Sequence, residues 1–169
     1  MSKILVTYFS RGDEEYGVGE VETGNTELLA KAIIAKTGAD EFKIEPEVAY
    51  PVKYMECVDQ ATKEKEQNLR PTYKGDIDIT KYNTIYLGYP IWWGDLPMVV
   101  YTFLENHDLK GKTIIPFNTH EGSGNSGTYA SLQKKFPDAT FKGDGFNMAG
   151  HEARTEQGLQ KLDAWLEKN

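Results

Sequence analysis

The sequence predicts an α/β fold in which a three-layer, doubly wound parallel sheet of five strands is covered by helices on both faces. Short runs of β-branched and aromatic residues alternate along the chain with segments of helical periodicity. The first, third and fourth of these runs are almost continuously apolar, which is typical of central strands buried from both sides. No repeat and no linker divides the 169 residues, so we expect a single domain over residues 1–169.

Five segments account for the expected strands. They are residues 4–9, 40–44, 84–88 with their flanks, 113–118, and a weaker run near 139–142. The segment that follows the last run, residues 143–152, is loop-like around Phe146 and Met148. We therefore expect the fifth strand to be interrupted there.

Apolar residues spaced three and four apart predict a helix after each strand. The first helix is expected to end at Gly38, because glycine suits the left-handed position that follows a helix. Pro71 stops the second, the third begins after Asp95 and Pro97, and Ser126 is a candidate N-cap of the fourth. The apolar stripes are Leu28, Leu29, Ala32 and Ile33; Tyr54, Val58, Ala61 and Leu69; Val99, Val100, Phe103 and Leu104; Tyr129, Leu132, Gln133 and Phe136; and Leu159, Leu162, Trp165 and Leu166.

Composition excludes several classes of function. The formal net charge of −7 argues against a nucleic-acid partner, because such binding depends on Lys and Arg that neutralise phosphates. The single cysteine, Cys57, rules out an intramolecular disulfide and is expected to pack inertly, and no Cys/His cluster has the spacing of a metal site. The opening run MSKILVTYF is too short for a signal peptide, and nothing approaches the ~20 apolar residues that cross a bilayer. We expect a cytoplasmic protein without a membrane partner.

The first strand is followed by a candidate phosphate site. In an open α/β sheet, ligands bind beyond the carboxyl ends of the strands, where the strand order reverses. Ser10 follows the strand, and Thr23-Gly24-Asn25-Thr26 opens the next helix. Hydroxyl groups and the N–H groups of the first helical turn can donate to an anion, and Gly24 allows close approach. Because no P-loop lysine is present, these neutral donors favour a monophosphate over a nucleoside triphosphate; an ordinary capped helix is the alternative.

Two further loops lie at the same expected edge. The third strand runs into Pro90-Ile91-Trp92-Trp93-Gly94, whose adjacent tryptophans suit stacking on a flat ring, or alternatively form a lid packed on the next helix. The fourth strand runs into Thr119-His120-Glu121-Gly122-Ser123-Gly124, which can hydrogen-bond the polar edge of a heterocycle or form a plain surface loop. His120 either contacts the ligand and donates a proton near neutral pH, or hydrogen-bonds the loop backbone.

These three motifs, in this order and spacing, resemble the flavodoxin family over essentially the whole chain, with closest likeness to the bacterial branch that carries a P-I-W-W-G loop. The resemblance implies the strand order 2-1-3-4-5 and FMN as a non-covalent cofactor. It implies a phosphate site at Ser10, Thr23, Gly24, Asn25 and Thr26. It also implies ring contacts from Pro90, Ile91, Trp92, Trp93 and Gly94, and a pyrimidine side lined by Thr119, His120, Glu121, Gly122, Ser123 and Gly124.

The sequence departs from the family pattern in two places. In the family the serine and the T-G-N-T turn are nearly contiguous, whereas here an acidic insertion, residues 11–22, separates them and is expected to loop out. Its carboxylates are expected to face solvent: Asp13, Glu14, Glu15, Glu20 and Glu22. The loop after the fourth strand also lacks the tyrosine that stacks on the outer face of the ring in well-known flavodoxins. His120 or Tyr16 could cover that face, or it is open.

Two redox functions are consistent with this reading. The first is an electron carrier of low potential that docks on redox partner proteins through a basic surface of theirs, because an acidic chain disfavours further negative charge on the ring. The second is an NAD(P)H-dependent reductase of quinones or flavin, which an open ring face would permit. A flavin-free signalling module is disfavoured, because Ser10 stands where such a module needs an acidic residue. The chain is expected to be a monomer or a homodimer.

Overall fold

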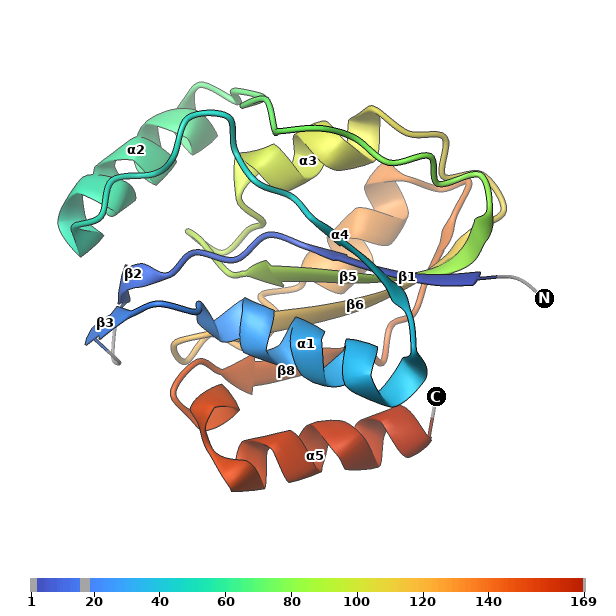
Figure 1. Ribbon diagram of the computed structural model, residues 1–169. Coiled ribbons are helices and arrows are strands. Elements are labelled where there is room, and N and C mark those ends of the chain that lie inside the picture. Colours follow the sequence, from blue (N-terminus) through green and yellow to red (C-terminus); the bar gives the residue numbers. More distant parts are fainter. Residues whose placement is uncertain (1–2, 16–18, 169) are drawn as a thin grey trace.

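A six-stranded parallel sheet forms the centre of the protein in the computed structural model, which describes residues 3–15 and 19–168 (Figure 1). Its path is β4-β1-β5-β6-β7, with β8 pairing to β6. Counted in chain order without the insertion, this is the predicted order 2-1-3-4-5, which is confirmed. The strands are β1 (Lys3–Tyr8), β4 (Asp40–Lys43), β5 (Tyr82–Pro90), β6 (Thr113–His120), β7 (Thr140–Phe141) and β8 (Phe146–Ala149).

The last strand position is split, as its sequence predicted, but the segment around Phe146 and Met148 that was predicted to be loop-like forms the strand β8. β7 pairs with the first two residues of β6, and β8 pairs with Phe117–His120 at its end. Between them the chain passes close to β6, where a Cβ on Gly145 would collide with the carbonyl oxygen of Pro116. The break has a functional consequence, because it allows β8 to extend the carboxyl edge of the sheet beside β6.

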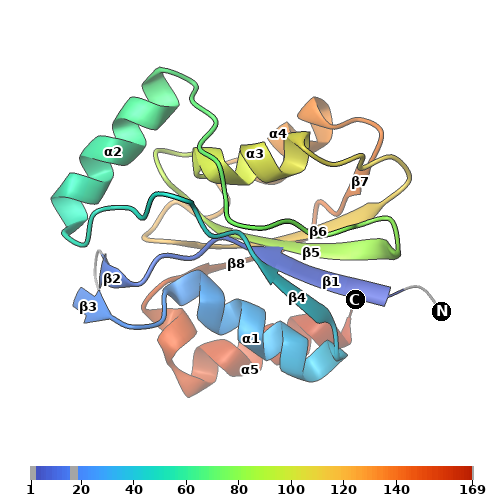
Figure 2. The ribbon, with the colours of Figure 1, turned by 45° about the horizontal axis from the view of Figure 1, so that its top comes forward.

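Helices cover both faces of the sheet, as expected for a doubly wound fold (Figure 2). α1 (Asn25–Thr37) and α5 (Glu156–Glu167) lie on one face; α2 (Tyr54–Glu66), α3 (Met98–Glu105) and α4 (Thr128–Lys135) lie on the other. Each face has its own apolar core, built around Leu29 and Phe117 on the first and around Leu87 and Phe103 on the second. Burying such a side chain stabilises the fold by roughly 1.5–3 kcal/mol. None of the helices within the described residues is long and apolar enough to span a membrane.

The helix ends match the sequence at two positions and differ at two. α3 begins at Met98, directly after Pro97, as predicted. Gly38 has a left-handed φ of 71° and its N–H donates to the Ile34 carbonyl, as predicted. α2 ends at Glu66, before the predicted Leu69, because Asn68 has a φ of 50° and leaves the helical path. Ser126 is not the N-cap of α4: Gly127 occupies that position, and the Ser126 hydroxyl donates to the carbonyl of Ser123 instead.

The acidic insertion, which was expected to loop out, forms an antiparallel hairpin. β2 (Asp13–Glu15) and β3 (Gly19–Val21) pair antiparallel, with Glu14 opposite Glu20. The reason is tertiary: both ends of the insertion are held together, so its two arms must run side by side. Glu22 is exposed, as predicted. The other four carboxylates of the insertion and Tyr16 lie outside the described side chains.

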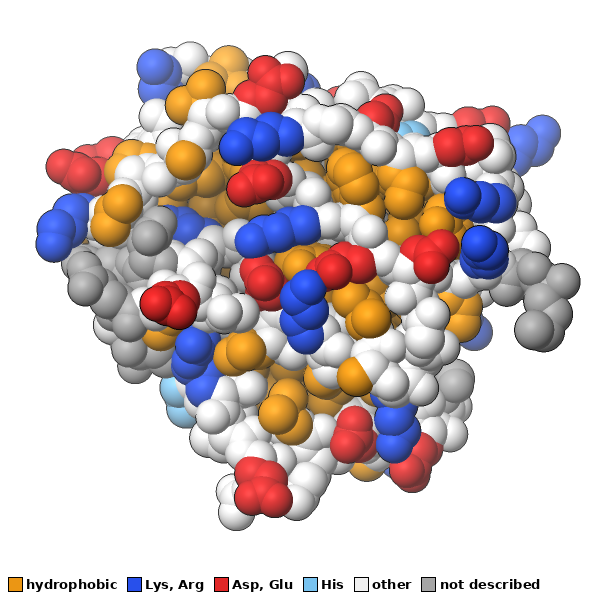
Figure 3. All heavy atoms as spheres, in the orientation of Figure 1, with side chains coloured by type: hydrophobic (Ala, Val, Ile, Leu, Met, Phe, Trp, Pro, Cys, Tyr) orange, Lys and Arg blue, Asp and Glu red, His pale blue; other side chains and the backbone are white. Residues whose placement is uncertain are grey.

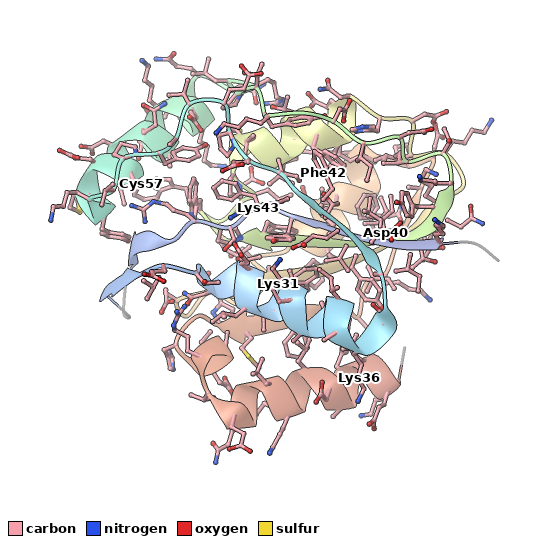
Figure 4. The ribbon with its side chains drawn as sticks, in the orientation of Figure 1. Lys31, Lys36, Asp40, Phe42, Lys43 and Cys57 are labelled. Carbon is pink, nitrogen blue, oxygen red and sulfur yellow. The ribbon has the colours of Figure 1, made fainter. Side chains whose placement is uncertain are left out.

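Ion pairs join α1 to the edge strand β4. Lys31 Nζ lies 2.7 Å from a Glu41 oxygen, and Lys43 Nζ lies 2.8 Å from Glu27 Oε1. Figure 4 shows Lys31 and Lys43 at this border between helix and strand. Exposed pairs of this kind contribute only about 0–1 kcal/mol each, so they add little to the stability of the fold.

Candidate functional site

Ser10 and Gly24, which the insertion separates in sequence, are in contact in the fold. The Ser10 Oγ accepts a hydrogen bond from the Glu27 N–H at 3.0 Å. Ser10 thus caps α1, a role that usually belongs to the N-cap residue, which here is Gly24 and has no side chain. A Cβ on Gly24 would collide with the Ser10 Oγ and the Arg11 carbonyl. Glycine is required by lack of space and not by backbone conformation, because its φ is −68°.

The beginning of α1 offers donors to an anion at the carboxyl edge of the sheet. Asn25 and Thr26 are buried in its first turn, where backbone N–H groups have no partner within the helix and the helix dipole is positive. The hydroxyl groups of Thr26 and Thr119 form a hydrogen bond of 2.7 Å, which connects α1 to the end of β6. One hydroxyl proton of this pair is left to donate elsewhere. The arrangement suits a phosphate dianion.

Arg154 adds a charge that the sequence reasoning missed. It ends the short helix η1 (Glu152–Arg154), and its Nη1 donates to the Thr23 carbonyl at 3.0 Å and to Asn25 Oδ1 at 2.7 Å. The expectation of neutral donors is therefore incomplete, since a guanidinium borders the same turn. No local pattern marks Arg154, because 131 residues separate it from Thr23.

A cleft of about 420 Å³ adjoins this helix start. Its size falls within the range of small-molecule sites. It brings together residues predicted from the two loops and adds Asn25 and Tyr54; the loop residues are Pro90, Ile91, Trp92, Trp93, Gly94, Thr119, His120, Glu121, Gly122 and Ser123. Sequence reasoning had placed Tyr54 only in a helical core stripe. Gly124 does not line the cleft.

The two tryptophans occupy different environments. The Trp92 N–H donates to the Asp95 carbonyl at 2.8 Å, and Trp93 and Gly94 have φ of 53° and 70°, so the turn between them is of type I′. The ring of Trp92 packs edge-on against Phe9 and Tyr50, with centroids 5.2 and 5.0 Å apart. Trp93, by contrast, is 59% exposed. A bulky residue at positive φ is strained, and such strain is concentrated at functional sites.

Asp95 closes this turn and gives it a pH dependence. Burial alone would raise the pKa of Asp95, but hydrogen bonds from Tyr101, Lys65 and the Leu96 N–H lower it overall. A depressed folded-state pKa stabilises the fold above the unfolded value of about 3.9 and loses that contribution as pH falls through the folded value. We expect Asp95→Asn to cost about 2 kcal/mol in urea denaturation at about pH 7.

The difference between Asp95→Asn and the wild type should begin to shrink below about pH 3.9, where the carboxyl group of the unfolded chain becomes protonated while that of the folded protein is still ionised. It should vanish once the pH has fallen below the depressed folded-state pKa of Asp95. Urea denaturation at about pH 3 checks this. A deficit that stayed constant with pH would mean that the charge of Asp95 does not stabilise the turn.

His120 and Glu121 place two titratable groups in the cleft. Burial lowers the pKa of His120, although a hydrogen bond to Asn147 acts in the opposite direction. Its Nδ1 accepts the Gly122 N–H at 2.9 Å, so the imidazole organises the loop backbone, as the second interpretation of His120 proposed. Burial also raises the pKa of Glu121. Both shifts favour neutral forms in the cleft.

Asn118 holds the loop after β6 in place. This fully buried side chain accepts a hydrogen bond from the Tyr129 hydroxyl at 2.5 Å and donates to the Gly124 carbonyl at 3.0 Å. Gly124 therefore contributes to the site by anchoring the loop. A buried amide that pairs both of its ends is a rigid positioning group.

Comparisons with known proteins agree on one family. A sequence model of the flavodoxin family matches residues 3–169. The chain is similar to a candidate flavoprotein from Bacteroides eggerthii, with 32% identity, a TM-score of 0.76 and coverage of 99% of this chain and 97% of that one. It is also similar to a flavoprotein from Lactobacillus acidophilus in complex with FMN, with 18% identity, a TM-score of 0.64 and coverage of 96% and 99%.

An NADH:FMN oxidoreductase in its apo form has the same fold at 12% identity and a TM-score of 0.56, with coverage of 99% of this chain and 88% of that one. No curated protein matches the chain. At such low identity the last two structures support the fold alone, whereas the family match spans nearly every residue and includes all three loops at the carboxyl edge. The chain belongs to the flavodoxin family.

Proposed function

We propose that this protein binds FMN non-covalently at the carboxyl edge of the sheet and serves as an electron carrier. The observation that supports this most is the junction of an anion-binding helix start with an aromatic cleft, through Asn25, which belongs to both. FMN, when bound, supplies one- and two-electron redox chemistry, and the protein supplies orientation and electrostatics.

The residues divide into a phosphate end and a ring end. At the phosphate end, Gly24 gives space, Ser10 and Thr23 offer hydroxyls, and the first turn of α1 offers N–H groups. At the ring end, Trp93 offers an exposed aromatic face, because Trp92 is committed to Phe9 and Tyr50. The two ends fit a ligand that joins a phosphate to a flat heterocycle.

The carrier assignment also rests on charge. With a net charge of −7, the chain disfavours adding negative charge to a bound ring, which lowers the potential for full reduction. The same charge favours basic redox partners through electrostatic steering.

The phosphate end is tested by a double substitution. We expect Ser10→Ala together with Thr26→Ala to weaken FMN binding about 100-fold, a loss of about 2.7 kcal/mol, while riboflavin binding changes little because riboflavin has no phosphate. Titration calorimetry with both ligands measures this. Thr37→Ala, at the other end of α1, is the matched control and should leave both affinities unchanged. Equal losses for the two ligands would show that the phosphate lies elsewhere.

The cofactor itself is tested by the visible absorption spectrum of the purified protein. A colourless protein that also fails to quench the fluorescence of added FMN would contradict the proposal. This observation is independent of the redox partner.

A second candidate function is an NAD(P)H-dependent reductase of quinones or flavin. It is favoured by the loop after β6, in which no tyrosine is present to stack on the outer face of the ring. The aromatic ring that this loop contributes to the cleft is His120, and its Nδ1 accepts a hydrogen bond from the Gly122 N–H. A ring face left uncovered could receive a nicotinamide. The shared fold with an NADH:FMN oxidoreductase is consistent with this role. Steady oxidation of NADPH with a quinone acceptor, faster than about one turnover per second, would favour the reductase over the pure carrier.

A further inference from the structure

A second cavity lies beside α2, away from the cofactor cleft. Its volume is about 600 Å³, within the range of small-molecule sites. Its walls come from the chain that precedes α2 (residues 46 and 48–51), from Gln60 and Glu64 of α2, and from the chain that follows it (residues 69–72). None of the described residues that line this cavity also lines the cofactor cleft.

Backbone hydrogen bonds hold the walls of the cavity together. The Glu47 N–H donates to the Thr72 carbonyl at 3.0 Å, and the Lys74 N–H donates to the Glu45 carbonyl at 2.7 Å. The chains before and after α2 are therefore paired with each other. Three of the lining residues are prolines, whose φ is fixed by the ring. The cavity is thus a pre-formed feature of the fold.

Glu64 is a buried carboxylate in the wall of this cavity, with 5% of the residue exposed. Its Oε1 accepts a hydrogen bond from the Tyr50 hydroxyl at 2.5 Å, and its Oε2 accepts one from Gln60 Nε2 at 2.9 Å. Both donors are neutral, and burial together with the Glu64 carboxylate raises the pKa of the Tyr50 hydroxyl well above its ordinary value. Because a carboxylate has about four lone-pair sites, each oxygen can accept a further donor.

The charge of Glu64 is not balanced within the described part of the chain, since none of the ion pairs there includes it. Arg70 is the cation among the described lining residues, and its Nε and Nη2 donate to Glu105 at 2.8 and 3.2 Å. Its Nη1 donates to Asn68 Oδ1 at 2.9 Å. A buried charge is costly unless an opposite charge accompanies it. The cavity therefore has a place for a cation.

The cavity is accessible from solvent. Val48 and Leu69, which both line it, are 84% and 37% exposed. Figure 3 shows hydrophobic side chains gathered over α2 and the chain beside it, at the upper left of that view. Since these apolar side chains are exposed and Glu64 is buried, an entering ligand meets apolar surface first and the carboxylate deeper in.

We propose that this cavity binds a small organic ammonium ion, whose N–H groups donate to Glu64 and whose apolar body packs against Val48 and Leu69. Such a ligand supplies a charge-assisted hydrogen bond and balances the buried carboxylate. The volume favours a free amine with a broad apolar body over the thin chain of a basic side chain from a partner protein. The proposal goes beyond the FMN assignment and does not depend on it, because the two sites share no described lining residue.

Titration calorimetry with cyclohexylmethylammonium tests the proposal, with cyclohexylmethanol as the neutral comparison of similar shape. We expect the wild-type protein to bind the ammonium ion at least about tenfold more tightly than the alcohol. Equal affinities, or no binding of the ammonium ion at millimolar concentration, would overturn the proposal. Nα-acetyl-lysine methylamide carries the same charge on a thin chain and should bind more weakly. If it bound as tightly, the site would serve a partner's basic side chain and the free amine would be wrong.

Three variants locate the site. Glu64→Gln keeps the shape of the side chain and removes its charge, so it should lower the affinity for the ammonium ion at least about tenfold and leave that for the alcohol unchanged. Glu66→Gln, the matched control, removes an exposed carboxylate from the same helix and should change neither affinity.

Ala49→Trp adds bulk to the cavity lining and should weaken both ligands. Thermal unfolding establishes that each variant is folded, and the comparison of the two ligands on the wild-type protein needs no variant. If Glu64→Gln and Glu66→Gln lowered the affinity for the ammonium ion equally, the attraction would come from the net charge of −7, and the proposal would fail.

Discussion

Gly24→Ala should strongly weaken FMN binding while leaving most of the fold intact. The added Cβ would collide with the Ser10 Oγ and with the backbone carbonyl of Arg11. Neither neighbour can move freely, because the Ser10 Oγ caps α1 through the Glu27 N–H and the Arg11 backbone leads into the hairpin, whose first strand begins at Asp13. We expect a stability loss of about 1–3 kcal/mol in urea denaturation, as for other overpacked sites. We expect FMN affinity to fall at least 100-fold in a fluorescence-quenching titration, or about 2.7 kcal/mol.

Gly38→Ala is the matched control for this change. It also replaces a glycine at an end of α1, but nothing lies within 4 Å of the new Cβ, and its cost comes from a φ of 71°. We expect it to lower stability by about 1–2 kcal/mol with FMN affinity unchanged. If Gly38→Ala lost FMN as strongly as Gly24→Ala, the effect would report general destabilisation and not the phosphate site.

Trp93→Asn should raise the stability of the protein and lower its affinity for FMN. The turn at Trp93 and Gly94 is of type I′, for which Asn-Gly is the favoured pair. Replacing a strained tryptophan by asparagine should therefore raise the free energy of unfolding by about 1 kcal/mol. The loss of ring stacking and apolar contact should weaken FMN binding about 100-fold, since stacking and burial together contribute a few kcal/mol.

The two expected effects of Trp93→Asn, higher stability and lower FMN affinity, have opposite signs, so general destabilisation cannot explain both. Urea denaturation of the FMN-free protein gives the stability change, and titration calorimetry gives the affinity. Trp93→Phe is the control, because it keeps both an aromatic ring and the positive φ, so it should preserve most of the affinity and gain no stability. A Trp93→Asn protein that was less stable and bound FMN normally would show that Trp93 is a packing residue.

Local sequence patterns were sufficient to predict most secondary-structure elements of the protein and the edge of the sheet where the site lies. The apolar runs and helical stripes predicted five of the six sheet strands and all five helices, because element type depends on periodicities of two and 3.6 residues that neighbours in sequence carry. The strand that was missed, β8, lies in a segment whose sequence is loop-like. Continuous apolar runs at β1, β5 and β6 predicted central strands. Since parallel strands place their carboxyl ends at one edge, three loops distant in sequence could be assigned to one site before any coordinates were known.

Helix ends and side-chain partners were harder to predict. Serine is a favoured N-cap residue, yet Gly127 and not Ser126 occupies the N-cap position of α4. The loop before this helix is held by the hydrogen bond from Asn118 to the Gly124 carbonyl, a contact that the local sequence does not reveal. The insertion was expected to loop out, but its pairing into a hairpin was not predicted; in the fold its two ends are brought together where Gly24 contacts Ser10 and Arg11.

The amino-acid sequence by itself therefore determined the order of elements, the edge where the site lies and the residue types that serve it. The tertiary structure alone decided which of the two cleft-lining tryptophans packs against Phe9 and which is mostly exposed, and it brought Arg154 to the phosphate turn. The physical reason is that periodicity is a local property of the chain, whereas a side chain's partner depends on packing between segments that are far apart in sequence.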